Sequence, residues 1–281
     1  MTDCPKCGGS ANESLRHCPS CGCDWGYPNV RRANTSGESN ALRSRYDRAR
    51  ADAAKRGIAN EFESCDSSVR NSSHVVVAMP LLFARTLLTD ARTLYTGYEA
   101  LIGAPTRVPA AFENDSERHA VGGRIFGSYA REIRYGVLSL NGRGLSNYGV
   151  AFVTLRDVVV RDRVTFLHEN SYLFSAEHDG DSSWPIGFLS SWANRHELAS
   201  AKLEPVLERD SSVSNWADLL VHEGTSRAGD RIIEAHIFGS FNADSIESIL
   251  FAEFETSRAD RSDIECIKEI LEKRERSRRH E

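Results

Sequence analysis

The residues with the clearest chemistry in this chain are five cysteines within the first 23 positions. Four of them form two knuckles of the form Cys-Pro-x-Cys-Gly, separated by ten residues. The glycine allows a tight turn in which backbone N–H groups face the sulfur atoms. Four thiolates complete the tetrahedral shell of Zn²⁺ and leave no open position, so we expect one structural zinc ion. Its ligands would be Cys4, Cys7, Cys18 and Cys21.

A fifth thiol, Cys23, lies beside this set and could compete with Cys21 for the metal. The chain has seven cysteines, and their clustering favours a metal site in a reducing compartment over a disulfide framework. The alternative is that the first five are free thiols in a disordered tail.

A second chemical feature is a carboxylate, Glu234, among isoleucines. Burying an unpaired carboxylate costs free energy, so such a residue is expected to be paired or used. In a strand, alternation places Glu234 and His236 on one face and Ile233, Ala235 and Ile237 on the other. This mixed face could line a cleft, or it could simply meet solvent.

Segments around this carboxylate resemble, in order and spacing, the ADP-ribosyltransferase domains related to bacterial toxins. The resemblance covers roughly residues 130–255. It is carried by RYGVLS at 134–139, YGVAFVTL at 148–155, RVTF at 163–166 with ENS at 169–171, and IEAHIFG at 233–239. In that family such segments surround NAD. The resemblance implies an α+β fold with a mixed or antiparallel sheet, and NAD as the substrate.

The same resemblance gives Glu234 the catalytic role. It would hold a ribose hydroxyl and stabilise the oxocarbenium-like charge that forms when nicotinamide leaves, as glycosidase carboxylates do. His236 stands where some relatives have glutamine and would contact the acceptor; the alternative is an ordinary half-buried histidine. Arginine-modifying members carry a second glutamate where Ile232 stands, so an arginine acceptor is not expected.

Five further residues are candidates for NAD binding. The Arg134 guanidinium could bind the pyrophosphate, and the Tyr148 ring could stack on nicotinamide. Asn141 stands beside glycines that leave the backbone open to a ligand, and Asn170 and Ser171 could reach the ribose. The alternatives are a surface arginine, a core tyrosine, a plain hairpin loop and a capped turn.

Charge is distributed unevenly along the chain. The whole chain carries −5, yet residues 30–56 contain eight basic residues and three acids. A basic segment beside a zinc module is consistent with an RNA or DNA footprint, and equally with a solvated helix face.

Length and composition favour a soluble globular protein with one large body and a small addition. The chain has 281 residues, of which 40% are hydrophobic and 27% charged. We see neither an apolar stretch long enough to span a membrane nor a signal peptide, so we expect a cytoplasmic protein.

The pattern divides the chain into a zinc ribbon at 1–33, a linker with a basic helix at 34–73, and an ADP-ribosyltransferase-like domain at 74–281. Polar breaks are expected at 34–40 and 65–73, and an apolar segment at 75–83. Helices are expected at 41–62, 85–102, 115–132, 192–207 and 263–276. Strands are expected at 135–140, 148–155, 164–167, 172–176, 231–238 and 248–254.

Three functions compete at this point. The first is an NAD-consuming ADP-ribosyltransferase whose zinc module and basic helix recruit a macromolecular acceptor; such a toxin would be held by an antitoxin or other inhibitor protein. The second is a non-enzymatic zinc-ribbon protein that binds nucleic acid or assembles with partners. The third, a metal-independent nuclease, lacks a paired histidine or lysine motif.

Overall fold

A computed structural model of the chain describes residues 2–4, 6–12, 14–90, 92–96, 115–178, 184–225 and 229–278. Helices flank a central sheet of seven strands, in which every strand pairing is antiparallel. The expected α+β class with an antiparallel-rich sheet is therefore confirmed.

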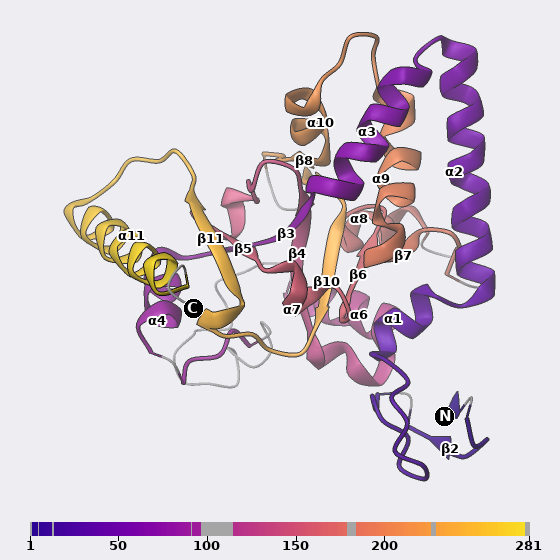
Figure 1. Cartoon of the computed structure of the whole chain (residues 1–281), viewed down its shortest axis with the longest axis horizontal. Coiled ribbons are helices and arrows are strands. Elements are labelled where there is room, and N and C mark those ends of the chain that lie inside the picture. Colours follow the sequence, from indigo (N-terminus) through magenta and orange to yellow (C-terminus); the bar gives the residue numbers. More distant parts are fainter. Residues whose placement is uncertain are drawn as a thin grey trace.

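The strands of this sheet follow the order β11-β5-β3-β4-β10-β6-β7. Strand β10 therefore lies between β4 and β6, inside the sheet (Figure 1). The bounds are β3 His74–Met79, β4 Ile133–Ser139, β5 Ala151–Leu155, β6 Val164–Leu167, β7 Leu189–Ser191, β10 Glu234–Phe238 and β11 Ile246–Phe251.

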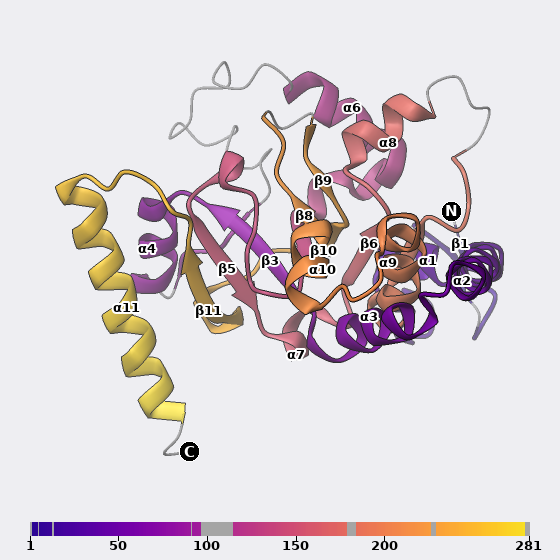
Figure 2. The same ribbon diagram turned by 90° about the horizontal axis from the view of Figure 1, so that it is seen from above.

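One face of the sheet packs against long helices and forms the main core (Figure 2). Alternate residues such as Val77, Phe166 and Ile237 point into this core and are completely or almost completely buried. The helices on this side and at the β11 end are α2 Ser36–Arg56, α3 Ala59–Ser72, α4 Leu81–Thr89, α9 Arg195–Leu203, α10 Val213–Leu220 and α11 Arg258–Arg278.

The opposite face carries shorter elements. Helices α6 Asp115–Phe126 and α8 Ser171–Glu177 lie over the β10–β6 side (Figure 2). A hairpin of β8 Val221–His222 and β9 Arg231–Ile232 stands beside them. A one-turn helix, α7 Asp157–Val160, connects β5 to β6. No helix in the described ranges is both long and apolar enough to cross a membrane.

The N-terminal segment forms a small module at one end of the molecule (Figure 1). It contains a two-stranded ribbon, β1 Thr2–Asp3 with β2 Ser10–Ala11, and the cysteines. Helix α1 Pro28–Ala33 connects it to α2. Proline suits the first helical position because its missing N–H would have no helical acceptor there.

Most expected elements are present with shifted ends, but three expectations are wrong. The polar stretches expected as breaks at 34–40 and 65–73 belong largely to α2 and α3. Residues Phe62, Cys65, Asp66 and Val69 form a buried stripe at helical spacing, which the surrounding serines hide in the sequence. The strand expected at 172–176 is helix α8.

Other boundaries also moved. The strand expected at 148–155 begins at Ala151, after a 3₁₀ turn at Ser146–Tyr148. The helix expected at 85–102 is α4, which begins earlier and ends at Thr89; residues 97–102 lie outside the described residues. Helices α2 and α3 share the main core with the sheet, so segment 34–73 packs as part of the larger body.

A single buried carboxylate joins α2 to the segment before β7. One oxygen of Glu38 accepts hydrogen bonds from the backbone N–H groups of Gly187, Phe188 and Leu189, at 2.8, 2.9 and 2.7 Å. Burial raises the pKa of the Glu38 carboxyl, while the three donors act in the opposite direction. The contact fixes the long helix against the edge strand of the sheet.

We predict that Glu38→Ala lowers the free energy of unfolding by about 2–4 kcal/mol, because buried N–H groups lose their acceptor. Glu38→Gln keeps an acceptor oxygen of the same shape and should cost only about 1 kcal/mol. Urea unfolding at neutral pH measures both. The exposed Glu265→Ala on α11 is the control, with an expected change within about 0.5 kcal/mol. Equal losses in the two Glu38 variants would contradict this role.

Candidate functional site

The four knuckle cysteines come together in the structure. Their sulfur atoms all lie within 4.8 Å of one another. The Sγ atoms of Cys4 and Cys21 are 3.7 Å apart, and those of Cys7 and Cys18 are 3.6 Å apart. Zn–S bonds of about 2.3 Å give a tetrahedron with edges of about 3.8 Å. The four cysteines could therefore hold a metal ion, and their chemistry suits Zn²⁺.

The two knuckles have the same backbone geometry. Gly8 N–H donates to the carbonyl of Cys4, and Gly22 N–H donates to that of Cys18, both at 2.8 Å. Both glycines have φ of +69°, a conformation that disfavours any side chain. The Lys6 N–H lies 3.4 Å from Cys4 Sγ, as expected for a turn that stabilises a thiolate.

Cys23 is a close neighbour of the set. Its Sγ atom lies 3.3 Å from Cys4 Sγ. In the first knuckle the corresponding position, two residues after the second cysteine, is Gly9. The second knuckle therefore has a fifth sulfur atom at the position where the first knuckle has a glycine.

The second candidate centre is Glu234 on β10. Its side chain is 9% exposed, and one carboxylate oxygen lies 3.1 Å from Nε2 of His236. The same oxygen accepts a hydrogen bond of 2.9 Å from the N–H of Ser171. The main core contains Ile233, Ala235 and Ile237, so the expected alternation along this strand is confirmed.

Two of the expected ligand-binding residues lie at this centre. Asn170 is the N-cap of α8 and accepts the N–H of Tyr172 at 3.0 Å. Ser171, the first residue of that helix, meets Glu234 through its backbone N–H. The turn from β6 into α8 therefore brings a helix start and the carboxylate into contact.

His236 is completely buried. Its ring packs edge-on against Phe126 at 4.8 Å and against Tyr135 at 5.5 Å between centroids. Aromatic walls fix the imidazole plane, so its Nε2 atom is held toward Glu234. His236 was expected to contact an acceptor. Because its ring is enclosed, it could influence an acceptor only by way of Glu234.

A buried ion pair supports the same turn. Glu169 lies 3.1 Å from Lys202 Nζ and accepts the N–H groups of Asn170 and Ile232, both at 3.0 Å. Burial lowers the pKa of Lys202, and the charge of Glu169 opposes that shift. Glu169 therefore joins the start of α8 to the strand that leads into β10.

Arg134 lies on the other face of the sheet. Arg134 on β4 is paired with Ile237 on β10, so these two side chains lie on the same face of the sheet. Glu234 is an odd number of residues away from Ile237 along β10, so its side chain lies on the opposite face. The buried guanidinium donates to the carbonyls of Arg131 and Ile133 and to the Ser240 hydroxyl. The structure therefore separates Arg134 from Glu234.

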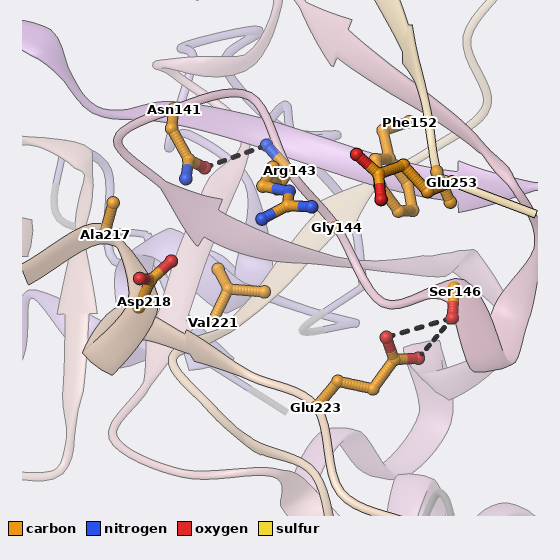
Figure 3. A pocket seen from close by; sticks show the side chains of 11 residues that line it. Asn141, Arg143, Gly144, Ser146, Phe152, Ala217, Asp218, Val221, Glu223 and Glu253 are labelled. Atoms are coloured by element: carbon orange, nitrogen blue, oxygen red, sulfur yellow. Dashed lines mark hydrogen bonds between the residues drawn. The ribbon is translucent and has the colours of Figure 1, made fainter. Parts of the chain in front are cut away.

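Asn141 and Tyr148 lie on the connection between β4 and β5. Asn141 lines a hollow in the surface (Figure 3). Tyr148 packs on the small apolar cluster formed by Val76, Leu145 and their neighbours. Neither Glu234 nor the start of α8 lines this hollow.

The hollow is lined by both apolar and charged residues. Phe152, Val221 and Ala252 are apolar lining residues. In Figure 3 the Glu223 carboxylate turns to the Ser146 hydroxyl, which lies 2.8 and 2.9 Å from its two oxygens. The charged lining residues are Arg143, Asp218, Glu223 and Glu253, so acids outnumber bases there. That balance disfavours a pyrophosphate, the group expected of NAD.

Most basic side chains of segment 30–56 form contacts within the chain. Six of its eight basic side chains contact acceptors in the same chain: Arg31, Arg43, Arg45, Arg50, Lys55 and Arg56. Arg48 is exposed and forms no ion pair or hydrogen bond within the described ranges.

Some residues of these centres were not expected from the sequence. Asp230, Asn147 and Asn29 are polar residues that fix loops or strands through buried or partly buried hydrogen bonds. The ion pair of Lys202 with Glu169 depends on a contact distant in sequence. Only the polar run at 169–171 signalled the turn.

Comparison with known proteins gives no family for the chain: no family model matches it, and no curated protein matches it.

We predict that the purified protein contains one zinc ion per chain, because four thiolates surround a single position. Cys18→Ser should abolish stoichiometric zinc, whereas Cys266→Ser, on α11, should retain it. Cys23→Ser should also retain it, since the other four thiolates remain. Elemental analysis by mass spectrometry measures all four proteins. Freshly purified wild-type protein without zinc would contradict the site.

Proposed function

We propose that the chain is an NAD-dependent ADP-ribosyltransferase that modifies a macromolecular acceptor, with Glu234 as its catalytic carboxylate. In this reaction the bond between nicotinamide and C1′ of ribose breaks, and the bonding electrons leave with nicotinamide. The acceptor nucleophile then bonds to C1′ and releases its proton. Nicotinamide and the ADP-ribosylated acceptor are the products.

The observation that carries this proposal is the environment of Glu234. Its carboxylate is almost completely buried. One of its oxygens accepts a hydrogen bond from the Ser171 N–H and lies 3.1 Å from Nε2 of His236. A negative charge fixed in low-dielectric surroundings stabilises a developing cation more strongly than one in water. Such a carboxylate suits a reaction whose transition state carries positive charge on the sugar.

The neighbouring elements support the same assignment. Asn170 and Ser171 approach Glu234 from a separate element, as residues that contact ribose would need to. Arg134 lies on the other face of the sheet and receives no role in NAD binding here, whereas stacking of Tyr148 on nicotinamide stays a prediction.

The zinc ribbon and the residues near it would contribute to acceptor recognition. Because most basic side chains at 30–56 are already paired, an RNA or DNA acceptor would meet only a few free charges there. A toxin of this class would need an inhibitor protein in its own cell.

We predict that Glu234→Gln lowers nicotinamide release from labelled NAD by about 10²–10³-fold, because the amide keeps the shape but loses the charge. The exposed Glu247→Gln on β11 is the matched control and should keep wild-type turnover. Thermal unfolding of both variants reports on the fold.

Wild-type turnover in Glu234→Gln would remove the main support for the transferase. If the wild-type protein releases no nicotinamide with any acceptor tried, the second function, a non-enzymatic zinc-ribbon binding or assembly protein, is favoured.

We also predict that Arg48→Ala weakens binding of a single-stranded RNA several-fold and reduces the slope of log K against log salt by about one, because one phosphate contact is lost. Arg258→Ala, at the start of α11, is the control and should change neither quantity. Fluorescence polarisation over a salt series measures both. Equal effects of the two substitutions would exclude segment 30–56 as the binding surface.

A further inference from the structure

Helix α1 and the turn before it connect the cysteine module to the sheet through specific contacts. The Arg31 guanidinium lies 5.2 Å from the centre of the Trp25 ring and donates to the Gly26 carbonyl at 2.7 Å. Trp25 itself packs with Cys4 and Cys18 in the core of the module. The first turn of α1 is therefore attached directly to residues that surround the thiolates.

The same helix reaches the β10–β6 pair through the side chain of Asn29, which is 3% exposed. Its Nδ2 atom lies 3.0 Å from the carbonyl oxygens of both Arg163 and His236. It also lies 3.3 Å from Oγ1 of Thr165. Because carbonyl oxygens only accept hydrogen bonds, the amide nitrogen must face them. One amide group therefore connects β10 with the start of β6.

Two further contacts attach α1 to this region. The Tyr27 ring lies 5.3 Å from that of Phe238, the last residue of β10. Ala33, at the end of α1, belongs to the same buried cluster as Phe126. Phe126 is also a wall of the His236 ring. The helix thus contacts β10 directly and the surroundings of its imidazole indirectly.

From these contacts we infer that Asn29 is a positioning residue for the Glu234–His236 pair, and that metal binding by the cysteine module reaches that pair through α1. The catalytic part of this inference rests on the proposed ADP-ribosyltransferase activity; the structural part does not. Asn29 acts through the backbone of His236, since its amide bonds the carbonyl of that residue.

The reason for the coupling is the weakness of the module without metal. Its buried core consists of Cys4, Cys18 and Trp25. Such a small cluster cannot offset the entropy of ordering the knuckles, so metal binding must supply that free energy. Helix α1 has six residues, too few to be stable alone. Loss of metal should therefore release Asn29 from the sheet.

The test is hydrogen exchange of the full-length, zinc-loaded protein. Asn29→Ala should speed exchange in peptides covering 231–238 and 164–167 about tenfold, because the amide hydrogen bonds are lost. Removing zinc from the wild-type chain with a chelator should do the same. Peptides from β3 should stay slow in both cases, which separates local loosening from global unfolding. The exposed Asn40→Ala on α2 is the control and should match wild type.

A second readout follows the imidazole itself. In protein labelled at histidine, the His236 resonances should shift in Asn29→Ala and on zinc removal, and should stay unchanged in Asn40→Ala. If the chain releases nicotinamide, Asn29→Ala should lower kcat about tenfold with little change in KM, because alignment is lost rather than binding.

The outcomes distinguish the two proposals. Faster exchange and shifted His236 signals without any nicotinamide release would support the coupling and exclude the transferase. Unchanged exchange on β10 after zinc removal would overturn the coupling, whatever the activity. If Asn29→Ala does not fold, hydrogen exchange of the wild-type protein with and without zinc still tests the coupling.

Discussion

Strand β10 lies inside the sheet, buried on both faces, yet it carries a carboxylate and an imidazole on one of them. Every polar group placed there must find a partner within the molecule, since water cannot provide one. The surrounding elements meet most of this constraint: α8 starts against Glu234, Nε2 of His236 faces Glu234, and Asn29 binds the His236 carbonyl from a different segment. Within the described residues, Nδ1 of His236 has no hydrogen-bond partner. The elements on this face of the sheet are therefore placed where they provide hydrogen-bond partners for the polar groups of β10.

Buried carboxylates have a common use in this fold. Glu38, Glu169 and Glu234 each accept backbone N–H groups from segments more than 60 residues away. An ionised carboxylate accepts several hydrogen bonds at once, and bonds to a charged group are stronger than neutral ones. Each acid thus joins its own element to a turn or strand end that is distant in sequence. Glu234 differs from Glu38 in its imidazole partner, which a purely structural N–H acceptor does not require.

Sequence patterns predicted those features that depend on local spacing. The alternation along 232–238 and the cysteine knuckles are of this kind, and the structure agrees with both. Features that depend on distant contacts were not predictable. The face of Arg134 relative to Glu234 depends on the register between β4 and β10. The apolar run at 172–176 fits a short strand or a helix, and the Asn170 cap decides for the helix.

The position of the cysteine module indicates how the module affects the rest of the molecule. A module that only recruited a partner would need no fixed contact with the body, and a flexible connection would serve it well. Here the connection is a short helix whose Asn29 side chain is buried between strands. An amide buried between two carbonyls restricts the motion of α1 relative to both strands. The contacts therefore favour a module that stabilises the strand carrying Glu234, and any partner that binds the module would act on that strand as well.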